Sequence, residues 1–139
     1  MSPVIIYNSR HGHTKHVVDY LGFLAHDVKN GQIPLGDFVI VLCPTYGDEE
    51  LPLAMEEYLL GLSITGKRYA LCELGNYYGY EDCQFGAAKI IRYCLSRLEW
   101  VEPFRPLSLD SLPVIDWDSL KEWKDGLCEF LQRERLLSG

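Results

Sequence analysis

The sequence feature that most limits the fold is the run at residues 38–43, which reads FVIVLC and contains no polar side chain. A strand with one face in solvent alternates polar and apolar residues, whereas a strand of a parallel sheet is covered on both faces and is apolar throughout. Residues 4–8 and 69–74 form similar short runs. Because parallel strands are joined by long crossover connections, we expect helices between these runs.

The stretches between these runs carry apolar residues at helical spacing. Four helices are expected, with the apolar faces Val17, Val18, Leu21, Leu24 and Ala25; Leu51, Ala54, Met55, Tyr58, Leu59 and Leu62; Ala87, Ala88, Ile91, Leu95 and Leu98; and Leu120, Trp123, Leu127, Phe130 and Leu131. Two weaker strands are expected at residues 28–33 and 101–109, and Pro103 and Pro106 suit an edge strand in the second of these.

The last expected helix has the clearest start signal. Asp116 or Asp118 can cap it, and Ser119 with Glu122 is a candidate capping box. Five strands alternating with four helices predict an α/β fold, a doubly wound parallel sheet with helices on both faces. The 139 residues are the length of one ordinary domain, so we expect a single domain over residues 1–139.

Charge and cysteine content exclude several classes of function. The net charge of -7 argues against nucleic-acid binding and favours a partner with a basic surface. Five cysteines without a C-x-x-C pair are typical of reduced, buried thiols in a cytoplasmic protein. The sequence opens on a strand-like run instead of a signal-peptide pattern, so we expect a protein that is not secreted. Its apolar stretches are far shorter than the roughly 20 residues that span a bilayer, so we expect no membrane span.

Parallel α/β sheets bind ligands beyond the carboxyl ends of their strands, so three connections are candidates. The first follows residues 4–8 and leads into a helix, whose N-terminus favours a phosphate. Its candidate contacts are Ser9, Arg10, His11, Gly12, His13 and Thr14. It is neither a Walker loop nor G-x-G-x-x-G, so a phosphate monoester fits better than ATP or a dinucleotide. An ordinary capped turn is the alternative, and a histidine metal site is disfavoured because no cysteine or carboxylate lies nearby.

The other two connections combine glycine with aromatic residues. The candidates in the second are Pro44, Thr45, Tyr46, Gly47 and Asp48, and those in the third are Gly75, Asn76, Tyr77, Tyr78, Tyr80, Glu81 and Phe85. A polar turn before a capped helix would also explain the second connection. Such a dense tyrosine cluster in a surface connection is hard to explain by packing, and stacking on a flat ring explains it.

Together these residues resemble the flavodoxin family. The family's phosphate loop, Ser/Thr-x-x-Gly-x-Thr, is matched by Ser9, Gly12 and Thr14, its second loop by Tyr46-Gly47-Asp48, and its third by Gly75, Asn76 and Tyr80. The similarity covers nearly the whole chain, and it implies FMN as cofactor and the strand order 2-1-3-4-5. His11, His13 and Asn76 depart from the usual pattern and bear on phosphate affinity and flavin potential.

The resemblance further implies an electron-transfer protein that shuttles single low-potential electrons. Its partners would be a flavin or ferredoxin-type reductase and an acceptor redox protein, both with basic docking surfaces, and we expect a monomer. Reduced flavin is anionic, so nearby acids lower its potential. The candidate acids are Asp48, Glu49, Glu50, Glu81 and Asp82.

Four alternatives exist, and the residues disfavour two of them. Residues 44–47 (PTYG) and 75–76 (GN) also resemble the flavoprotein that activates manganese-dependent ribonucleotide reductase, although a full terminal helix argues against it. A receiver domain is disfavoured because it needs acids where Asn8 and Cys43 stand. A low-molecular-weight phosphatase is disfavoured because it needs a cysteine where Ser9 stands. A binding domain without a cofactor is the fourth alternative.

Overall fold

One sheet organises the computed structural model, which describes residues 3–8, 13–31, 34–44, 51–75, 87–111 and 114–136. Its strands are β1 (Val4–Tyr7), β2 (Leu24–Asp27), β3 (Phe38–Pro44), β4 (Arg68–Gly75) and β5 (Leu107–Asp110). They lie in the order β2-β1-β3-β4-β5, and all neighbouring pairs are parallel. The five-stranded parallel sheet with the order 2-1-3-4-5 is therefore confirmed.

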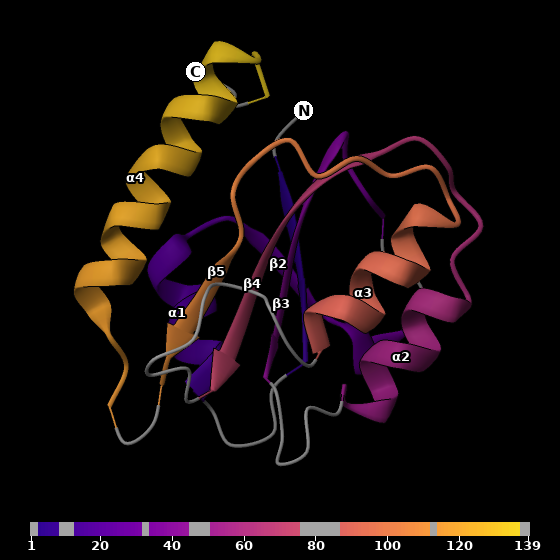
Figure 1. Cartoon of the computed structure of the whole chain (residues 1–139), viewed down its shortest axis with the longest axis horizontal. Coiled ribbons are helices and arrows are strands. Elements are labelled where there is room, and N and C mark those ends of the chain that lie inside the picture. The colour runs from indigo at the N-terminus through magenta and orange to yellow at the C-terminus, as the bar shows by residue number, and fades with distance from the viewer. Residues whose placement is uncertain are drawn as a thin grey trace.

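Helices cover both faces of this sheet. They are α1 (His13–Leu21), α2 (Leu53–Leu60), α3 (Ala87–Ser96) and α4 (Trp117–Arg133). Figure 1 shows α1 and α4 on one side of the sheet and α2 and α3 on the other, which confirms the doubly wound arrangement. Within the described residues, no helix combines the length and the apolar character needed to cross a membrane.

The position of β3 at the centre of the sheet explains why its sequence is uniformly apolar. Phe38, Ile40 and Leu42 belong to the core under α1 and α4. The alternate residues, from Val39 to Cys43, belong to the core under α2 and α3. None of these side chains is more than 1% exposed, so both faces of β3 are buried as predicted.

The second strand is an error of the sequence interpretation. The first helix ends at Leu21, and the stretch starting at Leu24 pairs with β1 instead of extending that helix. Gly22 ends the helix at a φ of +76°, which favours glycine, and donates its N–H to the Val18 carbonyl. The expected strand at 28–33 is wrong, because Val28–Asn30 forms a 3-10 turn.

The fifth strand and the start of α4 also differ in detail from the sequence prediction. Val101 makes an isolated bridge to Arg68, and β5 begins only at Leu107, because the two prolines between them supply no N–H to a ladder. Asp116 caps α4 as predicted, by accepting from the backbone of Ser119 at 3.2 Å. The proposed capping box is wrong, since the Ser119 hydroxyl itself donates to Asp116 at 2.7 Å.

Candidate functional site

The carboxyl ends of the strands meet at one edge of the sheet, which lies at the bottom of Figure 1. Registers place the end of β1 beside β3, the end of β3 beside β4 and the end of β4 beside β5. β1 leads into α1 on one face of the sheet, whereas its neighbour β3 leads towards α2 on the other face. The chain therefore reverses its winding between β1 and β3, and a crevice at that point is where doubly wound sheets bind ligands.

The N-terminus of α1 lies at this reversal and is free of acidic side chains. His13 is the first residue of the helix and is half-buried, and Thr14 follows it with an exposed fraction of 2%. Residues 9–18 contain no Asp or Glu in a chain that has 20 of them. Free N–H groups, a positive helix end and a threonine hydroxyl together suit an anion.

β3 and β4 supply closely packed backbone to the same edge. Pro44 ends β3 half-buried, and the buried Cys43 thiol before it donates to the Pro44 carbonyl at 3.3 Å. Burial raises the pKa of Cys43 well above its usual range, and the negative charge of Glu73 raises it further, so this thiol stays neutral. Gly75 ends β4, and its carbonyl accepts from the backbone of Ser111 at 2.9 Å.

Four of the sequence-predicted site residues lie within the described residues: His13 and Thr14 begin α1, the helix that follows β1, Pro44 ends β3 and Gly75 ends β4. The remaining predicted site residues lie outside the described residues: Ser9, Arg10, His11, Gly12, Thr45, Tyr46, Gly47, Asp48, Asn76, Tyr77, Tyr78, Tyr80, Glu81 and Phe85. Their roles stay predictions. What the fold establishes for them is that they directly follow β1, β3 and β4.

Sequence reasoning missed two buried polar residues near this edge. Asn8 is 3% exposed directly after β1, and Glu73 is fully buried in β4. Glu73 accepts from the backbone N–H of Ala88 in α3 and from the Ser108 hydroxyl in β5. A signal for it exists in the sequence, because a single acid inside the buried run 69–74 requires partners.

A shallow cleft of about 230 Å³ lies beside the sheet edge, between β5 and the start of α4. Its polar lining includes Arg105, Ser108 and Glu122. It is smaller than the usual ligand pocket of about 300 Å³ or more, and it borders an edge strand instead of the reversal between β1 and β3. We therefore place the candidate cofactor site at the reversal and not in this cleft.

Comparison with known proteins gives a clear answer for the fold. No family model and no curated protein matches the sequence. Among solved structures, oxidised flavodoxin 1 from Bacillus cereus is 19% identical with a TM-score of 0.72, over 99% of this chain and 100% of that one. The Fusobacterium nucleatum flavodoxin bound to flavin mononucleotide is 18% identical with a TM-score of 0.73, over 95% and 98%.

A third solved structure shows that the chain also resembles a short-chain flavodoxin in fold. A short-chain flavodoxin associated with a non-canonical PDU bacterial microcompartment is 16% identical with a TM-score of 0.68, over 94% of this chain and 99% of that one. At such identities the likeness establishes the fold. The chain therefore has the flavodoxin-like fold over almost its whole length, as the sequence motifs predicted.

Proposed function

We propose that this chain is an FMN-binding electron carrier of the flavodoxin type, acting in the cytoplasm. The observation that carries the proposal is the position of the strands that precede the three predicted loops. They are β1, β3 and β4, three neighbouring strands whose carboxyl ends lie at one edge of the sheet, and the fold is flavodoxin-like along nearly the whole chain. A phosphate-binding loop and two aromatic loops at one edge suit a phosphorylated flat cofactor.

The distribution of acids at the helix N-termini supports a phosphate at α1. The first turns of α2 and α4 contain Glu56 and Asp118, and α3 receives Glu73. α1 has no acid in its first turn and none in residues 9–12 before it. A negative ligand group would complement this helix as the acids complement the others.

FMN bound here would supply the capacity to accept and donate single electrons, and the chain would hold and orient it. Thr14 and the α1 N–H groups would bind its phosphate, and Tyr46 with Tyr80 would enclose its ring. The net charge of -7 favours reductases and acceptors with basic docking surfaces.

A second candidate function, activation of manganese-dependent ribonucleotide reductase, follows from the PTYG and GN motifs. Against it stands α4, a helix of 17 residues whose buried face contributes to the core on one side of the sheet. Oxygen uptake by the reduced protein in the presence and absence of that reductase separates the two functions. Uptake that depends on the reductase would favour the second candidate.

The cofactor proposal is tested by titrating the protein with FMN and with riboflavin, which lacks the phosphate. We expect FMN to bind much more tightly, with its fluorescence changing on binding. Thr14→Val keeps the volume of the side chain and removes its hydroxyl. A lost hydrogen bond to a charged group is worth about 1.5–3 kcal/mol, so the Kd for FMN should rise about tenfold or more while riboflavin binding stays unchanged.

The matched control is Thr65→Val, because Thr65 is exposed in the connection between α2 and β4. It should leave both Kd values unchanged. Failure of the unmodified protein to bind FMN at micromolar concentration would overturn the proposal. Equal losses of FMN and riboflavin affinity in Thr14→Val would remove Thr14 from the phosphate site.

A further inference from the structure

Glu73 is an ionisable side chain in a place where a charge is costly. It lies in β4 with no exposed surface, and its register partners are Cys43 on β3 and Ser108 on β5. Alternation along β4 puts it on the face covered by α2 and α3, where Leu71 belongs to the apolar core. A carboxylate so placed destabilises the fold unless it is held by specific partners.

Glu73 accepts hydrogen bonds from two different elements. Oε2 accepts the backbone N–H of Ala88 at 3.2 Å, and Oε1 accepts the Ser108 hydroxyl at 3.0 Å. Ala88 is the second residue of α3, where N–H groups have no acceptor within the helix. α3 has no acid in its own first turn, so Glu73 provides the negative charge that its N-terminus favours.

The hydrogen bond between Glu73 and Ala88 links the two ends of one of the predicted cofactor-binding connections. β4 ends at Gly75 and α3 begins at Ala87, so the Glu73 to Ala88 bond joins the two sides of the connection formed by residues 76–86. That connection contains the tyrosines predicted to stack on the cofactor. The bond to Ser108 ties the same point to β5.

We propose that Glu73 is a positioning residue for the candidate cofactor site: its buried carboxylate joins β4, the start of α3 and β5, and so fixes the spacing between Gly75 and Ala87, the two ends from which residues 76–86 depart. The inference rests on the proposed function for the identity of the ligand as FMN. Glu73 does not need to contact the cofactor for this role.

Three variants test the proposal. Glu73→Ala removes both hydrogen bonds, whereas Glu73→Gln keeps the shape and an acceptor oxygen. The control is Glu102→Ala, because Glu102 also links α3 to β4, by accepting from Arg92 at 2.7 and 2.8 Å and from Tyr69 at 3.3 Å. Tyr69 lies near the opposite end of β4, away from the site.

The first measurement is amide hydrogen exchange of the cofactor-free protein, at Ala88 and over residues 76–86. We expect exchange at Ala88 to be at least tenfold faster in Glu73→Ala, and close to that of the unmodified protein in Glu73→Gln and Glu102→Ala. Unchanged exchange in Glu73→Ala would overturn the proposal. This measurement does not depend on FMN, so it decides the role of Glu73 even if the protein binds no FMN.

The second measurement is the Kd for FMN. We expect a rise of about tenfold in Glu73→Ala, and less than threefold in Glu73→Gln and Glu102→Ala. An equal rise in Glu73→Ala and Glu102→Ala would mean that general loosening of α3 causes the effect, which contradicts a positioning role. A Gln variant as weak as the Ala variant, with Ala88 still protected, would assign the effect to charge and would also overturn the proposal.

Discussion

The N-termini of α3 and α4 begin at the same edge of the sheet, and each receives a carboxylate by a different route. In both helices the carboxylate oxygen lies 3.2 Å from a backbone nitrogen, that of Ala88 in α3 and that of Ser119 in α4. The acid of α4 is Asp116, three residues before Ser119, and it is only half-buried. The acid of α3 is Glu73, which lies 15 residues before Ala88 and is fully buried.

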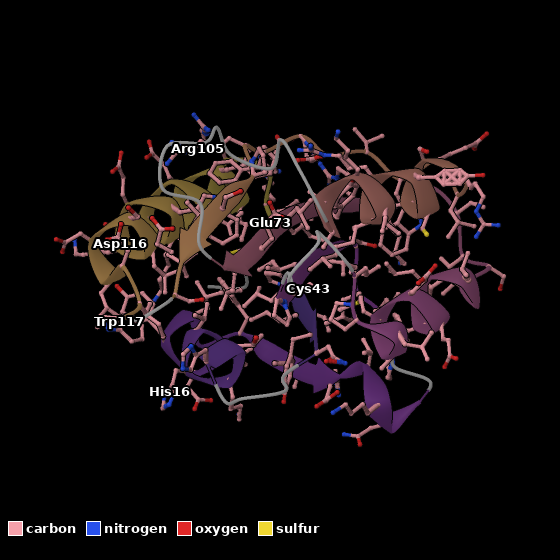
Figure 2. All side chains as sticks on the ribbon, turned by 60° about the horizontal axis from the view of Figure 1, so that its bottom comes forward. His16, Cys43, Glu73, Arg105, Asp116 and Trp117 are labelled. Atoms are coloured by element: carbon pink, nitrogen blue, oxygen red, sulfur yellow. The ribbon has the colours of Figure 1, made fainter. Side chains whose placement is uncertain are left out.

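This difference separates a local cap from a tertiary one. Asp116 needs only the few residues around it, and its removal leaves groups that water can reach. Glu73 depends on the packing of β4 against β5 and α3, and its removal takes a buried acceptor away from the Ala88 N–H and the Ser108 hydroxyl. Figure 2 shows the same contrast, with Glu73 and Cys43 near the centre of the molecule and Asp116 and Trp117 towards one side.

The largest expected effect is on stability when Glu73 is removed. Glu73→Ala should lower the free energy of unfolding by about 2–3 kcal/mol, because the Ala88 N–H and the Ser108 hydroxyl lose a buried acceptor. Glu73→Gln should lower the free energy of unfolding by about 1 kcal/mol, the usual net worth of one hydrogen bond. Urea denaturation measures both, and a loss in Glu73→Ala no larger than that in Asp116→Ala would abolish the distinction between the two caps.

The second expected effect is a loss of stability at high pH that depends on Cys43, the neighbour of Glu73 on β3. The folded protein keeps this thiol protonated because its pKa is raised. The unfolded chain releases the proton above the ordinary pKa of about 8.5, so stability falls as pH rises. Cys43 contributes at most about 1.4 kcal/mol per pH unit to this fall.

Cys43→Ala should flatten the dependence of unfolding free energy on pH between about 8.5 and 10. Cys128→Ala is the comparison, because burial raises the pKa of that half-buried thiol on α4 as well, but less than it raises that of Cys43, so this variant should flatten the slope less. Slopes that match in the unmodified protein and in Cys43→Ala would contradict the burial of a neutral thiol beside Glu73.

The smallest expected effect belongs to the local cap. Asp116→Ala should lower the free energy of unfolding by about 1 kcal/mol at neutral pH, the usual value of an N-cap. Hydrogen bonds from the Ser119 hydroxyl and backbone lower the pKa of Asp116. Its contribution is therefore present above the ordinary pKa of about 4 and disappears as pH falls through the lower folded value.

Thermal unfolding of Asp116→Ala and the unmodified protein between pH 7 and pH 2 measures this contribution. The difference between the two proteins should shrink below about pH 4. A stability difference between the two proteins that grows on acidification would show that Asp116 does not cap α4 as a carboxylate. Asp116 could then no longer serve as the local cap in the comparison with Glu73.

The errors in the fold prediction have physical reasons that can be located in particular residues. β2 was misplaced because Leu24 and Ala25 continue the helical spacing of α1, while the decisive signal is Gly22, whose positive φ ends the helix. β5 was predicted too long because the apolar residues around Pro103 and Pro106 resemble a strand that those prolines interrupt. Strong runs such as β3 were predicted correctly because burial on both faces leaves an unbroken apolar pattern.

By itself, the sequence determined the fold class, the positions of three strands and four helices, and the three connections that carry the candidate cofactor residues. It could do so because hydrophobic periodicity and cap residues are local. Only the tertiary structure decided that Pro44 and Gly75 end adjacent strands, and that Glu73 accepts a hydrogen bond from a helix residue 15 positions further along the chain. Hydrophobic periodicity does not encode which residues of different elements contact each other. Such a contact can be identified only from the folded structure, in which the sheet brings the elements together.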